Sequence, residues 1–156
     1  MKGKKAMVLT EKETGLLKDM KSQEELCIKK YNKYKEEAKC PKLSELFASI
    51  ATAESEHLKT VNEIMSGKEP ASPKPLSENN AMCVACDYSS TADKDADCYL
   101  ISDLLSTEKH VSSLYNISVF EFNSPAVRKM LSHIQAEEQQ HGEKLYAFMK
   151  ANGMYN

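Results

Sequence analysis

Four stretches of the chain place apolar residues at steps of three and four, which is the period of an amphipathic α-helix. They cover about residues 10–39, 41–66, 98–122 and 124–152. Each stretch is roughly 25 residues long, which corresponds to about 37 Å of helix. Few alternating runs of the kind that predict β-strands occur between them. The pattern therefore predicts an all-α protein in which four helices pack as a bundle.

The connection between the second and third stretches is long. Residues 68–97 contain three prolines and many Ser, Asn and Asp residues, which predicts a loop. Such a loop can run the length of the bundle and return the chain to its starting end, a topology typical of ferritin-like folds. We therefore expect one ferritin-like domain over residues 1–156, with helix pairs at about 10–66 and 98–152 and a long crossover between helices 2 and 3.

The two helical halves resemble each other when the sequence is shifted by 84 positions. Between residues 16–65 and 100–149, 12 of the 50 ungapped pairs are identical. Random pairing at average composition would give roughly three. The excess indicates a duplicated helix pair, with the two copies related by a pseudo-two-fold axis.

Each helical stretch has an inward seam that is apolar except near its middle. There the first and third stretches carry one glutamate each, and the second and fourth carry a Glu-x-x-His pair: Glu24, Glu108, Glu54 with His57, and Glu138 with His141. Residues three apart share one face of a helix, so each pair can address one point. Glu24 lies 16 residues before Cys40 and Glu54 lies 14 residues after it, so the two face each other in an antiparallel hairpin. The same count holds for Glu108 and Glu138 around Ser124.

Four carboxylates that meet in an apolar core cannot all remain ionised without partners, because burying one bare charge costs several kcal/mol. Two divalent cations would resolve the conflict, and this ligand set is that of di-iron and di-manganese carboxylate proteins. We predict that the six residues bind two Fe ions, with Mn or Zn as alternatives. Glu54 and Glu138 would bridge the two ions. The alternative is a bundle in which the site is empty and the six groups are protonated and hydrogen-bonded.

Several residues near the seams have weaker claims to a role. Glu25, Glu56 and Glu137 lie off the seam and are expected to be solvated, although Glu137 could compete with Glu138 as a ligand. His110 and His133 are expected to be exposed. Tyr31 and Tyr115 lie two turns from seam glutamates, where they either fill the core, donate hydrogen bonds to the ligands or carry a radical. No catalytic residue follows from the sequence.

The chain has five cysteines, and two of them form the segment Cys83-x-x-Cys86 in the long loop. Five reduced thiols are the favoured interpretation for a protein made in the cytoplasm. The alternatives are a reversible disulfide in the loop, a zinc site completed by Cys98 and Cys40, and cross-linking through exposed thiols.

Charge and hydropathy exclude two classes of partner. The 21 basic residues against 23 acidic ones leave no excess to bind a phosphate backbone, so nucleic acid is not expected as a partner. No apolar run reaches 18 residues, and the apolar segment Ala6–Leu9 is too short for a signal peptide. We therefore expect synthesis in the cytoplasm, no secretion by a signal peptide and no membrane partner.

The Glu-x-x-His segments and their partner glutamates resemble the ferritin-like superfamily, including rubrerythrins. More narrowly, Asp103–Lys109, Tyr115–Phe122 and the end of the chain, from Ile134–Lys144 to Asn152–Tyr155, resemble the Coat F family of spore coat proteins. Thr10–Met65 resembles the first half of that family. The resemblance implies a protein of a spore-forming bacterium that is deposited on the spore coat. It also implies other coat proteins, or a second copy in a dimer, as partners.

Two functions of different class follow from these observations. The first is a dimetal protein that reduces O₂ or peroxide, or that oxidises ferrous iron, at a carboxylate-bridged pair. The second is a structural or assembly protein of the spore coat with an empty or vestigial metal site. The two are compatible, and whether the chain is an enzyme stays open at this point.

Overall fold

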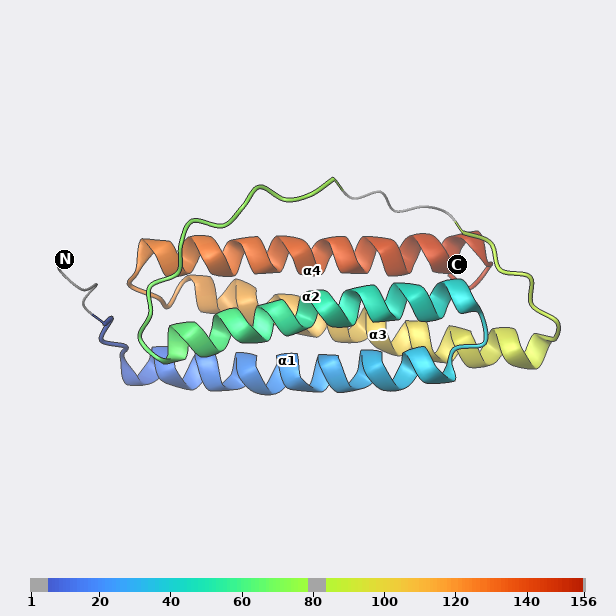
Figure 1. The fold of residues 1–156 in the computed structure, drawn as a ribbon, viewed down its shortest axis with the longest axis horizontal. Coiled ribbons are helices and arrows are strands. Elements are labelled where there is room, and N and C mark those ends of the chain that lie inside the picture. Colours follow the sequence, from blue (N-terminus) through green and yellow to red (C-terminus); the bar gives the residue numbers. More distant parts are fainter. Residues whose placement is uncertain (1–5, 79–83, 156) are drawn as a thin grey trace.

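The computed structural model describes residues 6–78 and 84–155, in which four long helices pack as a bundle (Figure 1). In chain order they are α1 (Glu11–Glu37), α2 (Pro41–Met65), α3 (Thr91–Val119) and α4 (Pro125–Ala151). Helix α1 packs against α2, and α3 packs against α4, as two antiparallel pairs. Helix α2 ends at one end of the bundle and α3 begins at the other, so that α2 and α3 point in the same direction (Figure 1). The predicted all-α bundle with a long crossover is confirmed.

The helices begin and end at residues suited to those positions. The Thr10 side chain accepts a hydrogen bond from the Glu13 amide, and the Glu13 side chain accepts one from the Thr10 amide, which together form a capping box. Ser124 caps α4, and Pro125 occupies its first turn. After α2 the chain turns at Gly67 with a φ of 88°, and a Cβ atom there would lie 3.1 Å from the carbonyl oxygen of Met7. This position requires glycine for both its backbone angle and its close neighbour.

The third helix is where the predicted boundaries are wrong. It begins at Thr91, seven residues before the predicted start at Cys98, and ends at Val119 rather than at Phe122. Its first turn is capped by Ser90, whose side chain accepts a hydrogen bond from the Asp93 amide. Most side chains of residues 91–96 are exposed or half-exposed, so this turn has no apolar stripe that a periodicity argument could detect.

The core follows the predicted seams. All but two of the predicted seam residues are buried. The buried ones are Leu17, Met20, Glu24, Cys27 and Tyr31 in α1; Leu43, Phe47, Ile50, Glu54, His57, Val61 and Ile64 in α2; Ile101, Leu104, Glu108, Val111, Tyr115 and Ser118 in α3, with Phe122 just after it; and Val127, Leu131, Ile134, Glu138, His141, Leu145 and Phe148 in α4. In α1, Tyr34 and Ala38 are half-buried instead. The apolar layers above and below the glutamates therefore shield the middle of the bundle from water.

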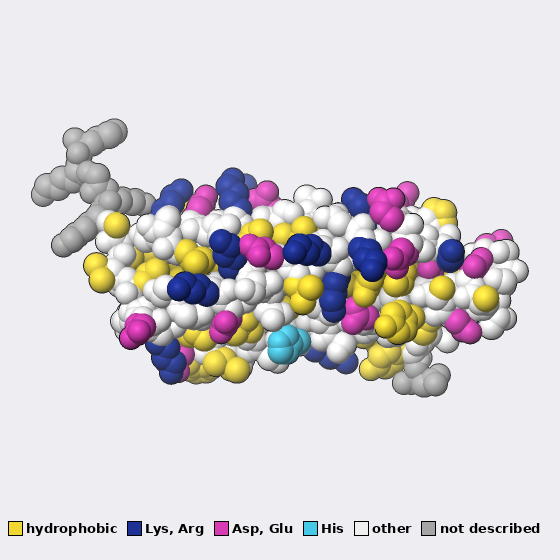
Figure 2. Space-filling view, turned by 90° about the horizontal axis from the view of Figure 1, so that it is seen from below, with side chains coloured by type: hydrophobic (Ala, Val, Ile, Leu, Met, Phe, Trp, Pro, Cys, Tyr) yellow, Lys and Arg dark blue, Asp and Glu magenta, His cyan; other side chains and the backbone are white. Residues whose placement is uncertain are grey.

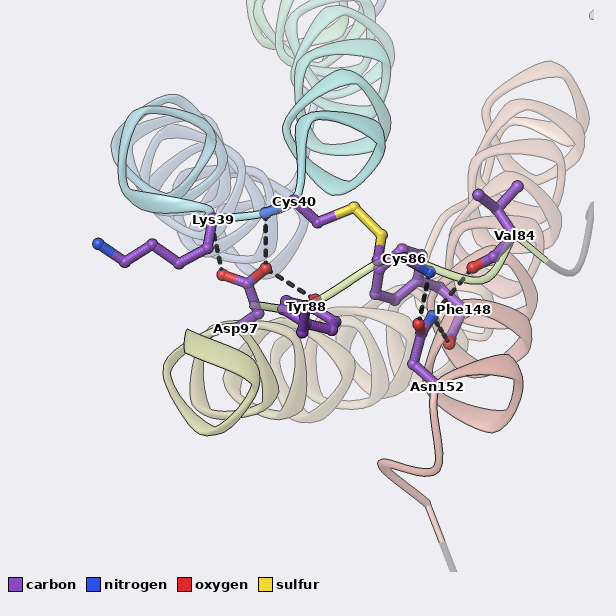
Figure 3. The surroundings of a disulfide bond; sticks show 8 residues. All are labelled: Lys39, Cys40, Val84, Cys86, Tyr88, Asp97, Phe148 and Asn152. Carbon is purple, nitrogen blue, oxygen red and sulfur yellow. Dashed lines mark hydrogen bonds between the residues drawn. A yellow bond between two sulfur atoms is a disulfide. The ribbon is translucent and has the colours of Figure 1, made fainter. Parts of the chain in front are cut away.

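A disulfide joins Cys40, in the turn between α1 and α2, to Cys86 at the end of the crossover (Figure 3). The expectation of five reduced thiols is therefore wrong. The fold brings the two Cα atoms to 6.2 Å, within the range that a disulfide spans. Because both sulfurs are used, Cys40 and Cys86 are not available to a zinc ion. Cys83, the other half of the predicted Cys-x-x-Cys segment, lies outside the described residues.

Hydrogen bonds fix both of the chain segments that the disulfide joins (Figure 3). The fully buried carboxylate of Asp97 accepts hydrogen bonds from the amides of Lys39 and Cys40 at 2.7 and 3.0 Å. The Tyr88 hydroxyl donates to the same carboxylate at 2.8 Å. On the other side, the Cys86 amide donates to the side chain of Asn152 at 2.8 Å. The end of the crossover is therefore held to α3 and α4 as well as to the turn before α2.

The surface mixes charges of both signs. On the face seen in Figure 2, lysine and arginine side chains alternate with acidic ones, and hydrophobic side chains lie between them. Within residues 6–78 and 84–155, no helix is long and apolar enough to span a bilayer.

Candidate metal centre

The six residues predicted as ligands meet in the middle of the bundle. They form two groups in which the possible ligand atoms lie within 4.8 Å of one another: Glu24, Glu54, His57 and Glu138 in one, and Glu54, Glu108, Glu138 and His141 in the other. All six residues are buried, and none is more than 5% exposed. Glu54 and Glu138 belong to both groups, which is the sharing predicted for bridging carboxylates.

Each histidine contacts the glutamate of the opposite Glu-x-x-His pair. His57 Nδ1 lies 2.8 Å from Glu138 Oε1, and His141 Nδ1 lies 2.8 Å from Glu54 Oε1. Within its own pair, each Nδ1 atom lies 3.5 Å from a glutamate oxygen. The remaining glutamates are slightly farther, with Glu24 Oε1 at 3.8 Å from His57 Nδ1 and Glu108 Oε1 at 3.6 Å from His141 Nδ1. These distances repeat almost identically in the two halves, as the internal repeat predicts.

Two tyrosines hold Glu24 and Glu108, the terminal glutamates, each of which belongs to only one of the two groups. Each tyrosine reaches across the bundle. The Tyr31 hydroxyl on α1 donates to Glu108 Oε1 on α3 at 2.6 Å. The Tyr115 hydroxyl on α3 donates to Glu24 Oε1 on α1 at 2.7 Å. Both tyrosines are fully buried. Of the roles considered from the sequence, the structure therefore bears out both core filling and the hydrogen bond to a seam glutamate.

As long as all four glutamates are ionised, one oxygen of each has no hydrogen-bond donor. These are the buried Oε2 atoms of Glu24, Glu54, Glu108 and Glu138 in the described part of the chain. An unpaired buried acceptor costs about 1–3 kcal/mol, and more when it is charged. The four carboxylates and two imidazole nitrogens of the two groups form the oxygen-and-nitrogen donor set that Fe and Mn prefer. The residues present therefore fit a pair of divalent cations.

Without a bound metal, protons must balance the negative charges of the buried glutamates. Burial raises the pKa of Glu24 to about 11, and the neighbouring charges of Glu54 and Glu138 act in the same direction. Burial and the charge of Glu138 likewise raise the pKa of Glu108 well above its ordinary value. Both glutamates therefore hold a proton more tightly than an ordinary carboxyl group.

The bridging glutamates and the histidines show the opposite balance. Burial opposes ionisation of Glu54 and Glu138, but hydrogen bonds from a neighbouring glutamate and from both histidines outweigh it and lower each pKa. Burial also lowers the pKa of His57 and His141, but their glutamate partners outweigh it and raise each pKa well above the ordinary value. These directions favour two protonated glutamates, two carboxylates and two imidazolium groups, a combination with no net charge.

Glu137 lies closer to the site than its sequence position indicated. Its Oε1 atom lies 3.3 Å from His57 Nε2 and 3.1 Å from His133 Nε2. The hydrogen bond from His57 lowers the pKa of Glu137. The expectations that Glu137 is solvated and His133 exposed are therefore wrong, because their side chains are only 33% and 18% exposed. Glu25, Glu56 and His110 are exposed as expected.

A pocket opens from the solvent to this side of the site. Its volume is about 390 Å³, and it lies between α2 and α4 beneath residues 73–77 of the crossover. His57, His133 and Glu137 line it together with Glu56. The Ser77 carbonyl accepts a hydrogen bond from Gln140 at 2.9 Å, which holds the crossover over the pocket. The sequence could not reveal this pocket, because it depends on the path of the crossover.

Comparison with known families gives two matches that divide the chain. Residues 16–85 match rubrerythrin, and residues 96–156 match the Coat F domain. The first match contains Glu24, Glu54 and His57, and the second contains Glu108, Glu138 and His141. No curated protein and no solved structure matches the chain. The chain thus forms a helix bundle similar to Coat F and rubrerythrin, with buried Glu and His clusters that resemble a dimetal carboxylate site.

Proposed function

We propose that this protein binds two divalent transition-metal ions, Fe or Mn, in the middle of its four-helix bundle. Glu24 and His57 would serve one ion and Glu108 and His141 the other, with Glu54 and Glu138 shared between them. The observation that carries this proposal is the pair of buried groups in which four glutamates and two histidines bring their ligand atoms within 4.8 Å of one another. Zn would fit the same donors.

A bound Fe or Mn pair supplies electron transfer to or from O₂, peroxide or ferrous iron. The residues of this chain have separate tasks around it. The hydroxyl groups of Tyr31 and Tyr115 hold the terminal glutamates in place. The apolar seam residues above and below keep bulk water out, which strengthens every charge interaction inside the site. The pocket beside His57 gives a small molecule a route to the site.

Metal analysis tests the proposal directly. We expect protein purified without oxygen, then supplied with Fe(II) or Mn(II) and desalted, to retain close to two ions per chain. The matched variants are Glu54→Gln, which removes a shared ligand, and Glu25→Gln, which changes an exposed glutamate on α1. Only the first should lose metal. If the wild type retains no metal, or if Glu54→Gln retains as much as Glu25→Gln, the proposal is wrong.

The Coat F match over residues 96–156 favours a second function, as a building block of the spore coat. This function does not need a metal and is compatible with the first. A fluorescent fusion expressed during sporulation would test it. We expect the fusion to collect at the spore surface. Fluorescence spread uniformly through the mother cell would contradict this function. The Glu54→Gln variant of the fusion then shows whether localisation depends on the metal ligands.

A further inference from the structure

The two histidines of the site differ in what lies behind them. Nδ1 of each histidine faces the glutamates, and Nε2 of each ring points away from them. Behind His57, Glu137 Oε1 lies 3.3 Å from Nε2. The shift of 84 positions that relates the two halves matches Glu137 with Ala53, which has a methyl group that cannot accept a hydrogen bond. The internal repeat is thus broken at the residue that supports one histidine.

This contact has a defined chemical effect on a histidine that binds a metal. When Nε2–H donates to a carboxylate, the proton is fixed on Nε2 and the lone pair of Nδ1 faces the metal. The carboxylate also makes the imidazole a stronger base, so it binds a cation more tightly. His57 is on the rigid helix α2, whereas Glu137 comes from α4, so the contact also fixes the ring relative to both helices.

We propose that Glu137 is a positioning residue for His57, and that it makes the two metal positions unequal, with the ion beside His57 bound more tightly. This inference rests on the proposed function. Glu137 contacts Nε2 of His57 and belongs to neither group of possible metal ligands.

Two further contacts support this role. His133, one turn before Glu137 on α4, lies with Nε2 at 3.1 Å from the same oxygen, Oε1. It therefore holds the Glu137 carboxylate toward His57. The repeat matches His133 with Ser49, so this second support is also confined to one half. In addition, the pocket beneath the crossover is lined by His57, His133 and Glu137, which places the whole arrangement at one edge of the site.

A titration with Co(II) under anaerobic conditions tests the inference without any assay of activity, because the ion's absorption reports its ligands. We expect wild-type protein to fill in two steps of different affinity. In Glu137→Gln the tighter step should weaken about 10- to 100-fold, the range typical of lost outer carboxylates, while the weaker step stays in place. The two Co(II) affinities would then become similar, and the two binding steps would no longer be resolved.

The matched control is Glu56→Gln, which removes the same charge from the same pocket. Among the described residues, Glu56 makes no hydrogen bond to His57, so the two steps should persist. If Glu137→Gln and Glu56→Gln shift the tighter step equally, the effect is one of pocket charge and the positioning role is wrong. Two equal steps in the wild type would also overturn it while leaving the proposed function intact. Failure of the wild type to bind Co(II) would instead remove the proposed function.

Discussion

The two helix pairs of this protein agree closely at the site and diverge around it. At the centre, the short histidine–glutamate distance is 2.8 Å in both halves, and the tyrosine hydrogen bonds differ by 0.1 Å, at 2.6 and 2.7 Å. Outside the centre, Glu137 corresponds to Ala53, and the disulfide-bonded Cys40 corresponds to Ser124. The buried glutamates and histidines of the centre cannot be substituted one at a time, because a single substitution leaves a buried charge without a partner. Residues outside the centre, such as Glu137 and Cys40, do not have this constraint.

The largest expected effect concerns the roles of the four glutamates. Glu54→Gln and Glu138→Gln should each reduce the metal content from two ions to none, because each removes a ligand that both ions share. Glu24→Gln and Glu108→Gln should each leave one ion, because each removes a ligand of one group only. Metal content measured by mass spectrometry of the native protein separates these outcomes. Equal losses in all four variants would show that Glu54 and Glu138 are not shared.

The pH dependence of stability is the next largest effect. In chelator-treated protein, Glu24 and Glu108 keep their protons above the ordinary pKa of 4.5, and His57 and His141 keep theirs above 6.5. The native state then holds more protons than the unfolded state, so the free energy of unfolding falls as pH rises. The fall is up to about 1.4 kcal/mol per pH unit for each such proton.

Thermal unfolding between pH 5 and pH 9 measures this slope. We expect the Tm of the chelated protein to fall steadily, and the metal-loaded protein to lose this dependence because two cations replace four protons. Glu24→Gln and Glu108→Gln should flatten the slope by similar amounts, as the symmetry of the site predicts. A Tm of the chelated protein that is constant or rises over this range would contradict the proton assignment.

The disulfide gives the third effect, and it belongs to one half only. Cys40→Ser places at this turn the residue that the other half has at Ser124. The bond links residues 46 positions apart, and a loop of this length contributes up to about 4 kcal/mol by restricting the unfolded chain. We expect urea unfolding to show a loss approaching this value, with the metal content unchanged. The control is Cys98→Ser, which removes a free thiol and should have a much smaller effect.

Sequence periodicity was sufficient for the bundle and for the six central residues, because both follow from local rules. A seam residue such as Glu54 is placed by the helical period, and its depth is set by counting from the turn at Cys40. Apart from Tyr34 and Ala38, the predicted seams are buried as expected. The start of α3 escaped prediction because its first turn is polar and is stabilised by a cap and by Asp97 rather than by apolar contacts.

The features that sequence reasoning missed depend on pairs of segments far apart in the chain. Cys40 and Cys86 meet only because the crossover ends beside the turn before α2. Glu137 reaches His57 only because α2 and α4 are neighbours in this bundle, with Nε2 turned outward. One local signal was present, since His133 and Glu137 lie four residues apart on one helix face. That spacing is common on solvated surfaces, so it carried little weight alone.

The smallest expected effect tests how far the symmetry of the site extends. Tyr31→Phe and Tyr115→Phe each remove one hydrogen bond, to Glu108 and Glu24, and leave the ring in the core. Because the raised pKa of each accepting glutamate favours its neutral form in the chelated protein, we expect each change to lower the free energy of unfolding by about 1 kcal/mol. Urea unfolding of the two variants should give values that agree within error. A clear difference between them would show that Glu137 and the disulfide, each present without a counterpart in the other half, distort the centre as well. The symmetry of the site would then be one of distances and not of energies.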